Sequence, residues 1–138
     1  MKVLLVNPPV RKKMHPQEIP IGLGMIASIT RNEGHKIAFL DLNAHRIPLQ
    51  VAAQEIMIDD YDIIGIGGLS SQYQDIRNIL PICRQIHPDA IIVAGGGFVT
   101  YMPDKMLRLR PEIDIIAIGE GEETWKDILK AGSKRDFS

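Results

Sequence analysis

Five short runs of apolar residues recur along the chain, and each run stops at asparagine, aspartate or glycine. They cover Lys2–Asn7, Lys36–Leu40, Ile63–Gly67, Ala90–Ala94 and Ile113–Ile118. The runs are continuous rather than alternating, which is typical of strands that are buried on both faces of a parallel sheet. The sequence therefore predicts five buried strands.

The segments between these runs carry apolar residues at helical spacing. They predict helices over Pro20–Glu33, Pro48–Ile58, Ser70 or Ser71 to about Ile86, Pro103–Leu109, and Gly121–Leu129. Either serine is suited to cap the third helix, and Pro81 inside that helix predicts a kink or a break.

Strands that alternate with helices predict an α/β fold. The right-handed crossover rule gives a three-layer, doubly wound, five-stranded parallel sheet with the flavodoxin-like strand order 2-1-3-4-5. A length of 138 residues suits one domain, which we expect to cover residues 1–131. The polar residues 132–138 are expected to be a tail or the start of a linker.

Five loops follow the carboxyl ends of the predicted strands, where such sheets bind their ligands. They begin at Asn7, Asp41, Gly67, Gly95 and Gly119. Three of them are rich in glycine or serine, so a ligand can approach the backbone closely. This edge suits a large ligand laid across the strand ends, although glycines after strands can also serve only to make tight turns. Gly96→Val is expected to obstruct this edge and to leave the fold intact.

Composition and charge narrow the function. The net charge is −1, with 16 basic and 17 acidic residues, so nothing favours nucleic acid or an anionic membrane as a partner. No apolar run is long enough for a membrane span or a signal peptide, and a cytoplasmic location is expected. Cys83 is the one cysteine, so the chain can hold no disulfide and no iron–sulfur cluster of its own. We expect Cys83 to be buried and inert.

Phosphate-binding motifs are missing from the expected positions. The first strand is not followed by Gly-x-Gly-x-x-Gly, the chain has no Gly-x-x-x-x-Gly-Lys-Ser/Thr, and Asn7-Pro8-Pro9 is not a flavodoxin-type phosphate loop. A flavin or nucleotide carrier is therefore disfavoured, but it is kept as an alternative.

The histidines and large aromatic residues offer few candidates for chemistry. His35 and His87 flank turns and are expected to be solvated, whereas His45 could face the ligand edge and His15 could supply a metal ligand from the first loop. Trp125 and Phe98 are expected to pack rather than to stack on a ligand.

An ordered set of motifs resembles a known family. The set is Asn7-Pro8-Pro9, Pro20-Ile21-Gly22-Leu23-Gly24, Gly34-His35, Asp41, Tyr61-Asp62-Ile63-Ile64-Gly65, Gly95-Gly96-Gly97 and Gly119-Glu120-Gly121-Glu122. It is similar to the N-terminal cobalamin-binding domain of cobalamin-dependent radical S-adenosylmethionine enzymes. The resemblance covers about Lys2 to Leu129.

The resemblance implies a cobalamin-binding module. Its partner would be a radical S-adenosylmethionine domain, in cis or in trans, that carries the cluster and performs methyl transfer or another radical reaction. This chain alone would not be catalytic. The candidate cofactor-binding residues are Asn7, Pro8, Asp41, Gly67, Ser70, Ser71, Gly95, Gly96, Gly97, Gly119 and Glu120.

Two features depart from related patterns. The Asp-x-His-x-x-Gly of methionine-synthase-like domains is missing after the first strand, so the resemblance implies no protein histidine below cobalt. Phe98 stands where the family often has a histidine after the fourth strand. Phe98 favours a rival hypothesis, a docking or interaction module that has lost its ligand, whereas the glycine loops favour the binder.

Overall fold

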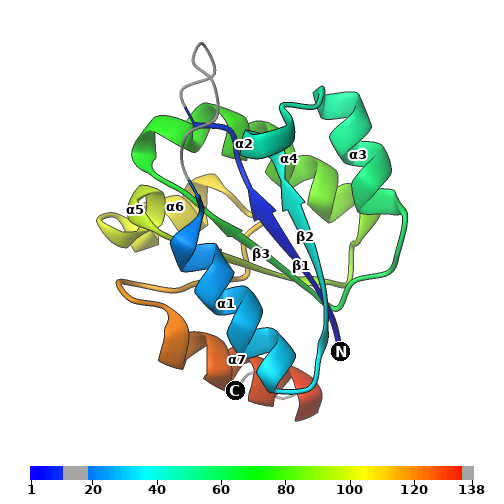
Figure 1. Ribbon diagram of the computed structural model, residues 1–138. Helices are drawn as coiled ribbons and strands as arrows, with labels where there is room; N and C mark the ends of the chain where they lie inside the picture. Colours follow the sequence, from blue (N-terminus) through cyan, green and yellow to red (C-terminus); the bar gives the residue numbers. More distant parts are fainter. Residues whose placement is uncertain (11–18, 135–138) are drawn as a thin grey trace.

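The computed structural model describes residues 1–10 and 19–134. Its centre is a five-stranded, all-parallel sheet with the strand order β2-β1-β3-β4-β5. The strands are β1 (Lys2–Asn7), β2 (Lys36–Asp41), β3 (Ile63–Gly67), β4 (Ile91–Gly95) and β5 (Ile115–Ile116). The predicted fold class and strand order are confirmed (Figure 1).

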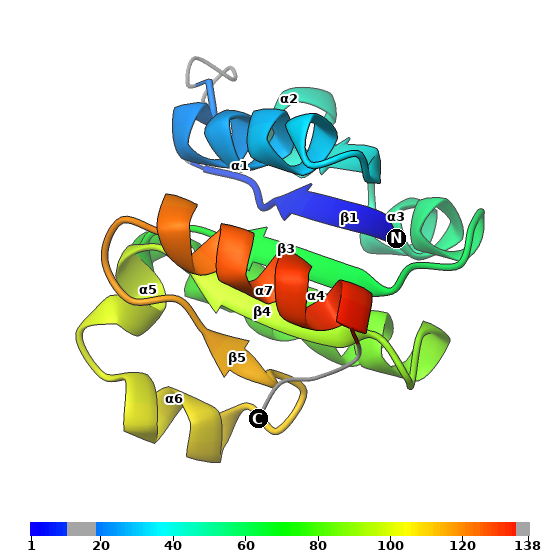
Figure 2. The same ribbon diagram turned by 90° about the horizontal axis from the view of Figure 1, so that it is seen from below.

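Helices cover both faces of the sheet. One face packs against α1 (Ile21–Asn32) and α7 (Glu122–Lys134), and the other packs mainly against α3 (Leu49–Met57) and α4 (Tyr73–Ile86). Figure 2 shows α7 in front of β3 and β4, with α4 behind them. Two short helices, α5 (Gly97–Thr100) and α6 (Pro103–Leu109), lead from β4 to β5.

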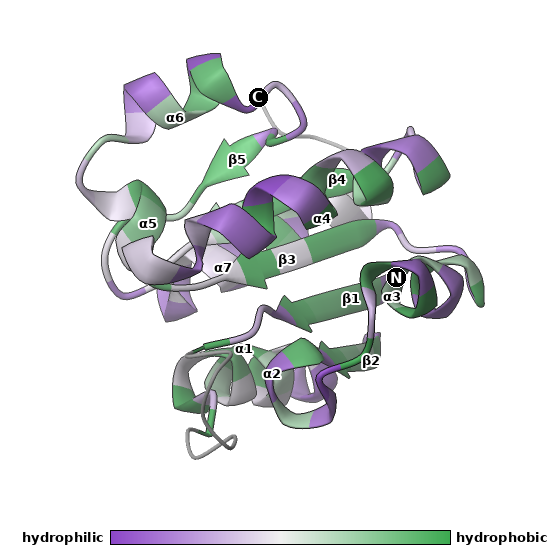
Figure 3. Ribbon diagram, turned by 90° about the horizontal axis from the view of Figure 1, so that it is seen from above, coloured by the Kyte–Doolittle hydropathy of each residue, from purple (hydrophilic) through white to green (hydrophobic). Residues whose placement is uncertain are grey.

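The core consists of two apolar layers, one on each face of the sheet. Successive strand residues point to opposite faces, so Leu4, Ile64 and Ile92 pack under α3 and α4, whereas Leu5 and Val93 pack under α1 and α7. In Figure 3, the strands are green, the colour of hydrophobic residues, and the outer helices carry the purple of hydrophilic residues. The double burial explains why the strand sequences are continuously apolar.

Several element boundaries differ from the prediction. The residues after β2 form a short helix, α2 (Leu42–His45), because the Asp41 carboxylate accepts hydrogen bonds from the N–H groups of Asn43 and Ala44. The last helix runs to Lys134 rather than ending at Leu129. Gly132 lies against Met1 and Ile63 there, so it is part of the packed structure.

The structure contradicts part of what was predicted for the third helix. A kink at Pro81 stays a prediction, but α4 is continuous through this exposed residue, so the helix has no break there. Neither Ser70 nor Ser71 caps it, since they lie in a 3-10 turn, η1 (Ser70–Gln72), where the side chain of Gln72 accepts the N–H of Leu69 at 2.7 Å.

The fifth strand has only two residues in regular pairing, not the six predicted. Asp114 replaces the start of the ladder, because its carboxylate accepts the N–H of Ile92 at 2.8 Å. Arg84 on α4 fixes this arrangement. Its guanidinium donates to Asp114 and to the carbonyl oxygens of Pro88, Ala90 and Glu112.

Arg84→Met should therefore destabilise the fold. The substitution keeps an unbranched side chain and removes every one of these hydrogen bonds, so we expect a loss of about 1–3 kcal/mol in the free energy of unfolding. The control is Arg77→Met, an exposed arginine on the same helix. Urea denaturation of both variants checks the prediction, and equal midpoints would contradict it.

Candidate functional site

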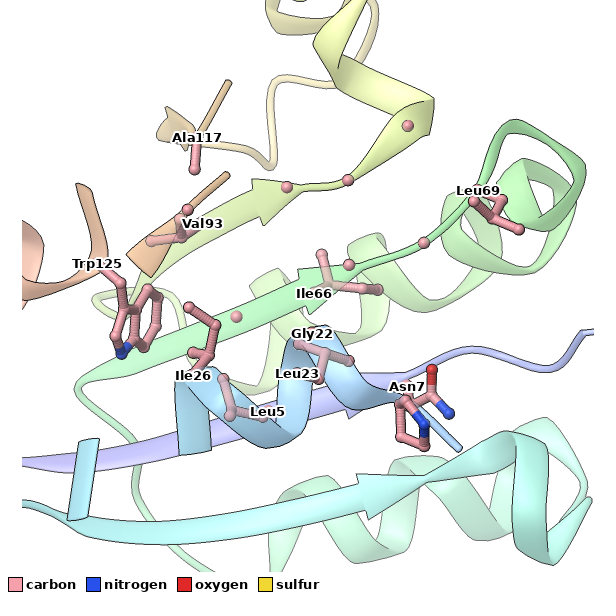
Figure 4. Close-up of a pocket in the computed structure, with 18 of the residues that line it drawn as sticks. Leu5, Asn7, Gly22, Leu23, Ile26, Ile66, Leu69, Val93, Ala117 and Trp125 are labelled. Atoms are coloured by element: carbon pink, nitrogen blue, oxygen red, sulfur yellow. The ribbon is translucent and has the colours of Figure 1, made fainter. Parts of the chain in front are cut away.

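A cavity of about 500 Å³ opens at the carboxyl edge of the sheet. It runs from the strand ends down between α1 and α7 to the middle of β3. Its mouth is lined by the last residues of β1, β3 and β4, which are Asn7, Gly67 and Gly95, and by loop residues such as Gly119. Its floor is lined by Leu5, Ile26, Gly65, Val93 and Trp125. Figure 4 shows Trp125, Ile26 and Leu5 together beside β3, with Asn7 at the end of β1 and Leu69 beyond the end of β3.

Trp125 is one of the residues that form the floor, and Thr30 holds its side chain in place. The indole Nε1 donates a buried hydrogen bond to Thr30 Oγ1 at 2.8 Å, which joins α7 to α1. The Thr30 hydroxyl donates in turn to the carbonyl oxygen of Ile26, also at 2.8 Å. Trp125 is 3% exposed and Thr30 is fully buried, so the orientation of the indole is fixed.

Glycine at position 65 allows the side chains of Leu5 and Trp125 to pack directly against the backbone of β3. A Cβ atom at this position would lie 2.7 Å from Leu5 Cδ2 and 3.2 Å from the indole ring of Trp125. A strand residue with a side chain would push both groups outward. Glycine inside a strand often marks such a close approach.

Hydrogen bonds join the loops at the mouth into one framework. Asn7 donates to Asp41 at 2.9 Å, and Gln72 donates to the carbonyl oxygen of Pro8 at 2.8 Å. The N–H of Phe98 donates to the carbonyl oxygen of Gly68 at 3.2 Å, linking the loops after β3 and β4. These bonds link the loops to one another, so few groups at this edge would need to be ordered by a ligand.

The pocket brings together most of the predicted site residues. Its lining includes Asn7, Gly67, Gly95, Gly96, Gly97, Gly119 and Glu120. Four predicted residues lie outside it. The Pro8 carbonyl and the Asp41 carboxylate are engaged in the framework, while Ser70 and Ser71 are exposed on the 3-10 turn. That the lining residues bind a ligand stays a prediction.

Sequence reasoning missed the floor of the pocket. Leu5, Val93 and Trp125 are apolar residues that read as ordinary core. The usable signal for the floor was Gly65 inside an apolar strand. At the mouth, Gly22 lies in the first turn of α1, where the structure shows that a Cβ atom would meet nothing within 4 Å. An unobstructed glycine that lines a pocket leaves room for a ligand rather than for the protein itself.

Phe98 is not part of the pocket. Its side chain is 5% exposed and packs in the core beneath α4, with its ring centroid 6.5 Å from that of Tyr73. A phenylalanine at this position therefore takes no polar group away from the pocket, and it gives the docking hypothesis no support.

None of the histidines that the structure describes lines the pocket. His87 was expected to be solvated, but it is 7% exposed and its Nε2 lies 2.8 Å from the carbonyl oxygen of Ile56. His35 lies at the opposite edge of the sheet beside the N-terminal amine, and burial, with a smaller effect from that ammonium, lowers its pKa. His45 is exposed outside the pocket. His15 lies outside the described residues.

A reactive thiol or a cluster of metal-ligand side chains would be a further candidate for chemistry in the described part of the chain. Cys83 is buried as predicted, and burial raises the pKa of its thiol to about 12. Within the described ranges, no three acidic, histidine or cysteine side chains gather where they could hold a metal ion. None of the described helices combines the length and apolar character that a membrane span requires.

Comparisons with known proteins agree with this architecture. The family model of the B12 binding domain matches residues 9–129, so the chain belongs to the B12-binding domain family. The predicted cobalamin-binding domain is thereby confirmed, and the ligand-free docking alternative is not favoured.

Two curated relatives match nearly all of the chain. The uncharacterized methyltransferase PH0819 of Pyrococcus horikoshii is 34% identical over 97% of this chain and 30% of its own length. An anaerobic magnesium-protoporphyrin IX monomethyl ester cyclase of Synechocystis is 30% identical over 95% of this chain and 28% of its own length. The chain thus spans less than a third of these relatives.

A solved structure shares the fold. The radical S-adenosylmethionine methyltransferase TsrM from Kitasatospora setae, with cobalamin and a [4Fe-4S] cluster bound, superposes with a TM-score of 0.84 at 24% identity. The match covers 99% of this chain and 25% of TsrM.

The expected effect of Gly96→Val changes with the structure. Gly96 adopts φ 89° and ψ −175°, a region that glycine alone occupies readily. A Cβ atom there would also lie 2.6 Å from the carbonyl oxygen of Gly68. The earlier expectation that the fold would stay intact is therefore wrong.

We predict that Gly96→Ala lowers the free energy of unfolding by about 1–3 kcal/mol, because it strains the backbone where two loops meet. Gly97→Ala is the matched control, since its Cβ would lie 3.8 Å from Leu69 in ordinary contact. Thermal denaturation of both variants checks the prediction. It fails if the two variants melt together.

Proposed function

We propose that this chain holds cobalamin across the carboxyl edge of its sheet, with the nucleotide tail of the cofactor in the pocket between α1 and α7. The observation that carries the proposal is the shape of that pocket, which has a glycine-lined mouth and an apolar floor above Gly65. Its volume of about 500 Å³ suits a drug-sized group. A whole cobalamin is larger, so the corrin ring would lie outside, over the strand ends.

The residues present fit such a ligand. The bare backbone at Gly67, Gly95 and Gly97 would let the corrin ring and its side-chain amides approach the strand ends. Leu5, Val93 and Trp125 would enclose the flat base of the tail in apolar contact. Bound cobalamin would supply a cobalt centre that can carry a methyl group, and this chain would bind and orient it.

The surface around the mouth suits a covering partner. Ile19, Ile21, Leu69 and Ile118 each expose more than half of their surface there. We infer that a radical S-adenosylmethionine domain, in cis or in trans, covers the bound corrin. In cis, the connection to it would begin after α7, which runs to Lys134, rather than at residue 132. The partial coverage of the curated relatives and of TsrM supports this arrangement. A cluster in that domain, its methyl-transfer reaction and a cytoplasmic location belong to the same proposal.

Gly22→Leu tests the position of the tail. Gly22 lines the mouth of the pocket in the first turn of α1, and a Cβ atom there would meet nothing within 4 Å, so the new side chain has room to project toward the mouth. We expect the affinity for hydroxocobalamin to fall at least tenfold, about 1.4 kcal/mol, as measured by calorimetry. Helical propensity should keep the fold at least as stable as before.

Gly24→Leu is the matched control for this experiment. Gly24 lies on the same helix, also has open space at its Cβ position, and does not line the pocket. Equal cobalamin affinity of the two variants would contradict the placement of the tail.

The absorbance spectrum of bound cobalamin tests whether the base of the nucleotide tail is a ligand of cobalt. If the tail base occupies the pocket it cannot also bind cobalt, so hydroxocobalamin should become base-off when it binds. Absorbance spectroscopy during the titration checks this. A base-on spectrum would contradict the proposal, and a histidine-ligated spectrum would point to His15 or His45.

A further inference from the structure

The floor of the pocket offers no hydrogen-bonding group to a ligand. Of the five side chains and backbone positions that form it, only Trp125 carries a polar side-chain atom, and its Nε1 is committed to Thr30. The hydroxyl of Thr30 is committed in turn to the carbonyl oxygen of Ile26. The backbone at Leu5, Gly65 and Val93 lies in paired strands of the sheet.

The polar lining groups lie at the mouth instead. Asn7 and Gln72 belong to the hydrogen-bonded framework of the loops, and Glu120 precedes α7. Glu122 begins α7, so it lies nearly one helical turn closer to the mouth than Trp125. The pocket is therefore polar where it opens and apolar where it ends.

We propose that this floor selects corrinoids by the base of their nucleotide tail, favouring an apolar benzimidazole over a purine. The inference rests on the proposed function. A buried adenine would bring an amino group and ring nitrogens to a surface with no partner for them, and each unpaired polar group costs binding energy. The methylated benzene ring of dimethylbenzimidazole needs no such partner and would gain apolar contacts with Leu5, Val93 and Trp125.

Thr30 is the positioning residue for this selectivity. It holds the indole with its benzo edge toward Gly65, where a Cβ atom would be 3.2 Å from the ring. It also occupies the single N–H donor of the floor. Without the Thr30 hydroxyl, the indole N–H of Trp125 loses its acceptor and the ring can reorient. The preference of the floor for dimethylbenzimidazole over adenine should then fall.

The test compares three corrinoids on the unmodified chain by calorimetry. These are cobalamin, the corrinoid with adenine in place of dimethylbenzimidazole, and cobinamide, which lacks the nucleotide tail. We expect cobalamin to bind at least tenfold more tightly than either of the others. Equal or tighter binding of the adenine form would overturn the inference, and so would cobinamide binding as tightly as cobalamin. Failure of all three to bind would instead overturn the proposed function.

A pair of variants tests the role of Thr30. Thr30→Ser keeps the hydroxyl and should keep the preference for cobalamin over the adenine form. Thr30→Val keeps the volume, removes the hydroxyl and should reduce the ratio of the two affinities at least threefold. A ratio unchanged in Thr30→Val would overturn the positioning role.

Val93→Thr tests the same base preference without disturbing the Trp125–Thr30 hydrogen bond that joins α1 and α7. Val93 is 3% exposed in the floor, and threonine adds a hydroxyl at nearly constant volume. The new group would give a purine a partner, so the preference for cobalamin should fall. A preference as strong as that of the unmodified chain would overturn the explanation based on floor polarity.

Discussion

The buried hydrogen bond between Trp125 and Thr30 is the contact on which the pocket depends. A doubly covered parallel sheet normally fills the space between its helices and strands with side chains. Here α1 and α7 are tied to each other through this bond, 95 residues apart in sequence, while the strand beneath them has no side chain at Gly65. The indole of Trp125 therefore packs directly against β3 at Gly65, and the cavity opens from this floor toward the strand ends.

The loops at the mouth complete the arrangement by fixing its rim. The backbones of Gly68 and Gly96 lie so close together that a Cβ atom at Gly96 would be 2.6 Å from the carbonyl oxygen of Gly68, and Asn7 and Gln72 connect the neighbouring loops to the same edge. A rigid rim lowers the entropy that binding must overcome, because few groups need to be ordered by the ligand. It is also the reason that we expect substitutions at different glycines to have different effects. Gly96 is needed by the protein itself, whereas Gly22 is unobstructed.

Much of the fold could be predicted from the sequence, because continuous apolar runs that end in glycine or asparagine have few alternatives in a chain of this length. β1, β3 and α6 were predicted with the correct boundaries. The errors arose where a single side chain overrides the pattern. Asp41 nucleates a helix where a loop was expected, and Asp114 replaces most of the ladder of β5. Gln72 accepts the N–H of Leu69 in a 3-10 turn that precedes α4, where a serine cap was expected.

The site was predictable at its rim and not at its floor. Strand-end glycines point to the ligand edge by themselves, since topology brings all carboxyl ends of a parallel sheet together. The floor depends on the hydrogen bond between Trp125 and Thr30, a contact between distant segments that no local sequence pattern predicts. The floor residues have the same apolar character as core residues, and only the tertiary structure shows that a cavity borders them.

The most direct test of the account is the signal of the Trp125 indole N–H in a two-dimensional ¹H–¹⁵N NMR spectrum. The chain has a single tryptophan, so this signal is unambiguous. Titration with cobalamin should shift it, saturating at one equivalent, whereas cobinamide should leave it nearly unchanged. Saturable cobalamin binding with an unmoved indole signal would contradict the central claim that the tail of the cofactor enters between α1 and α7.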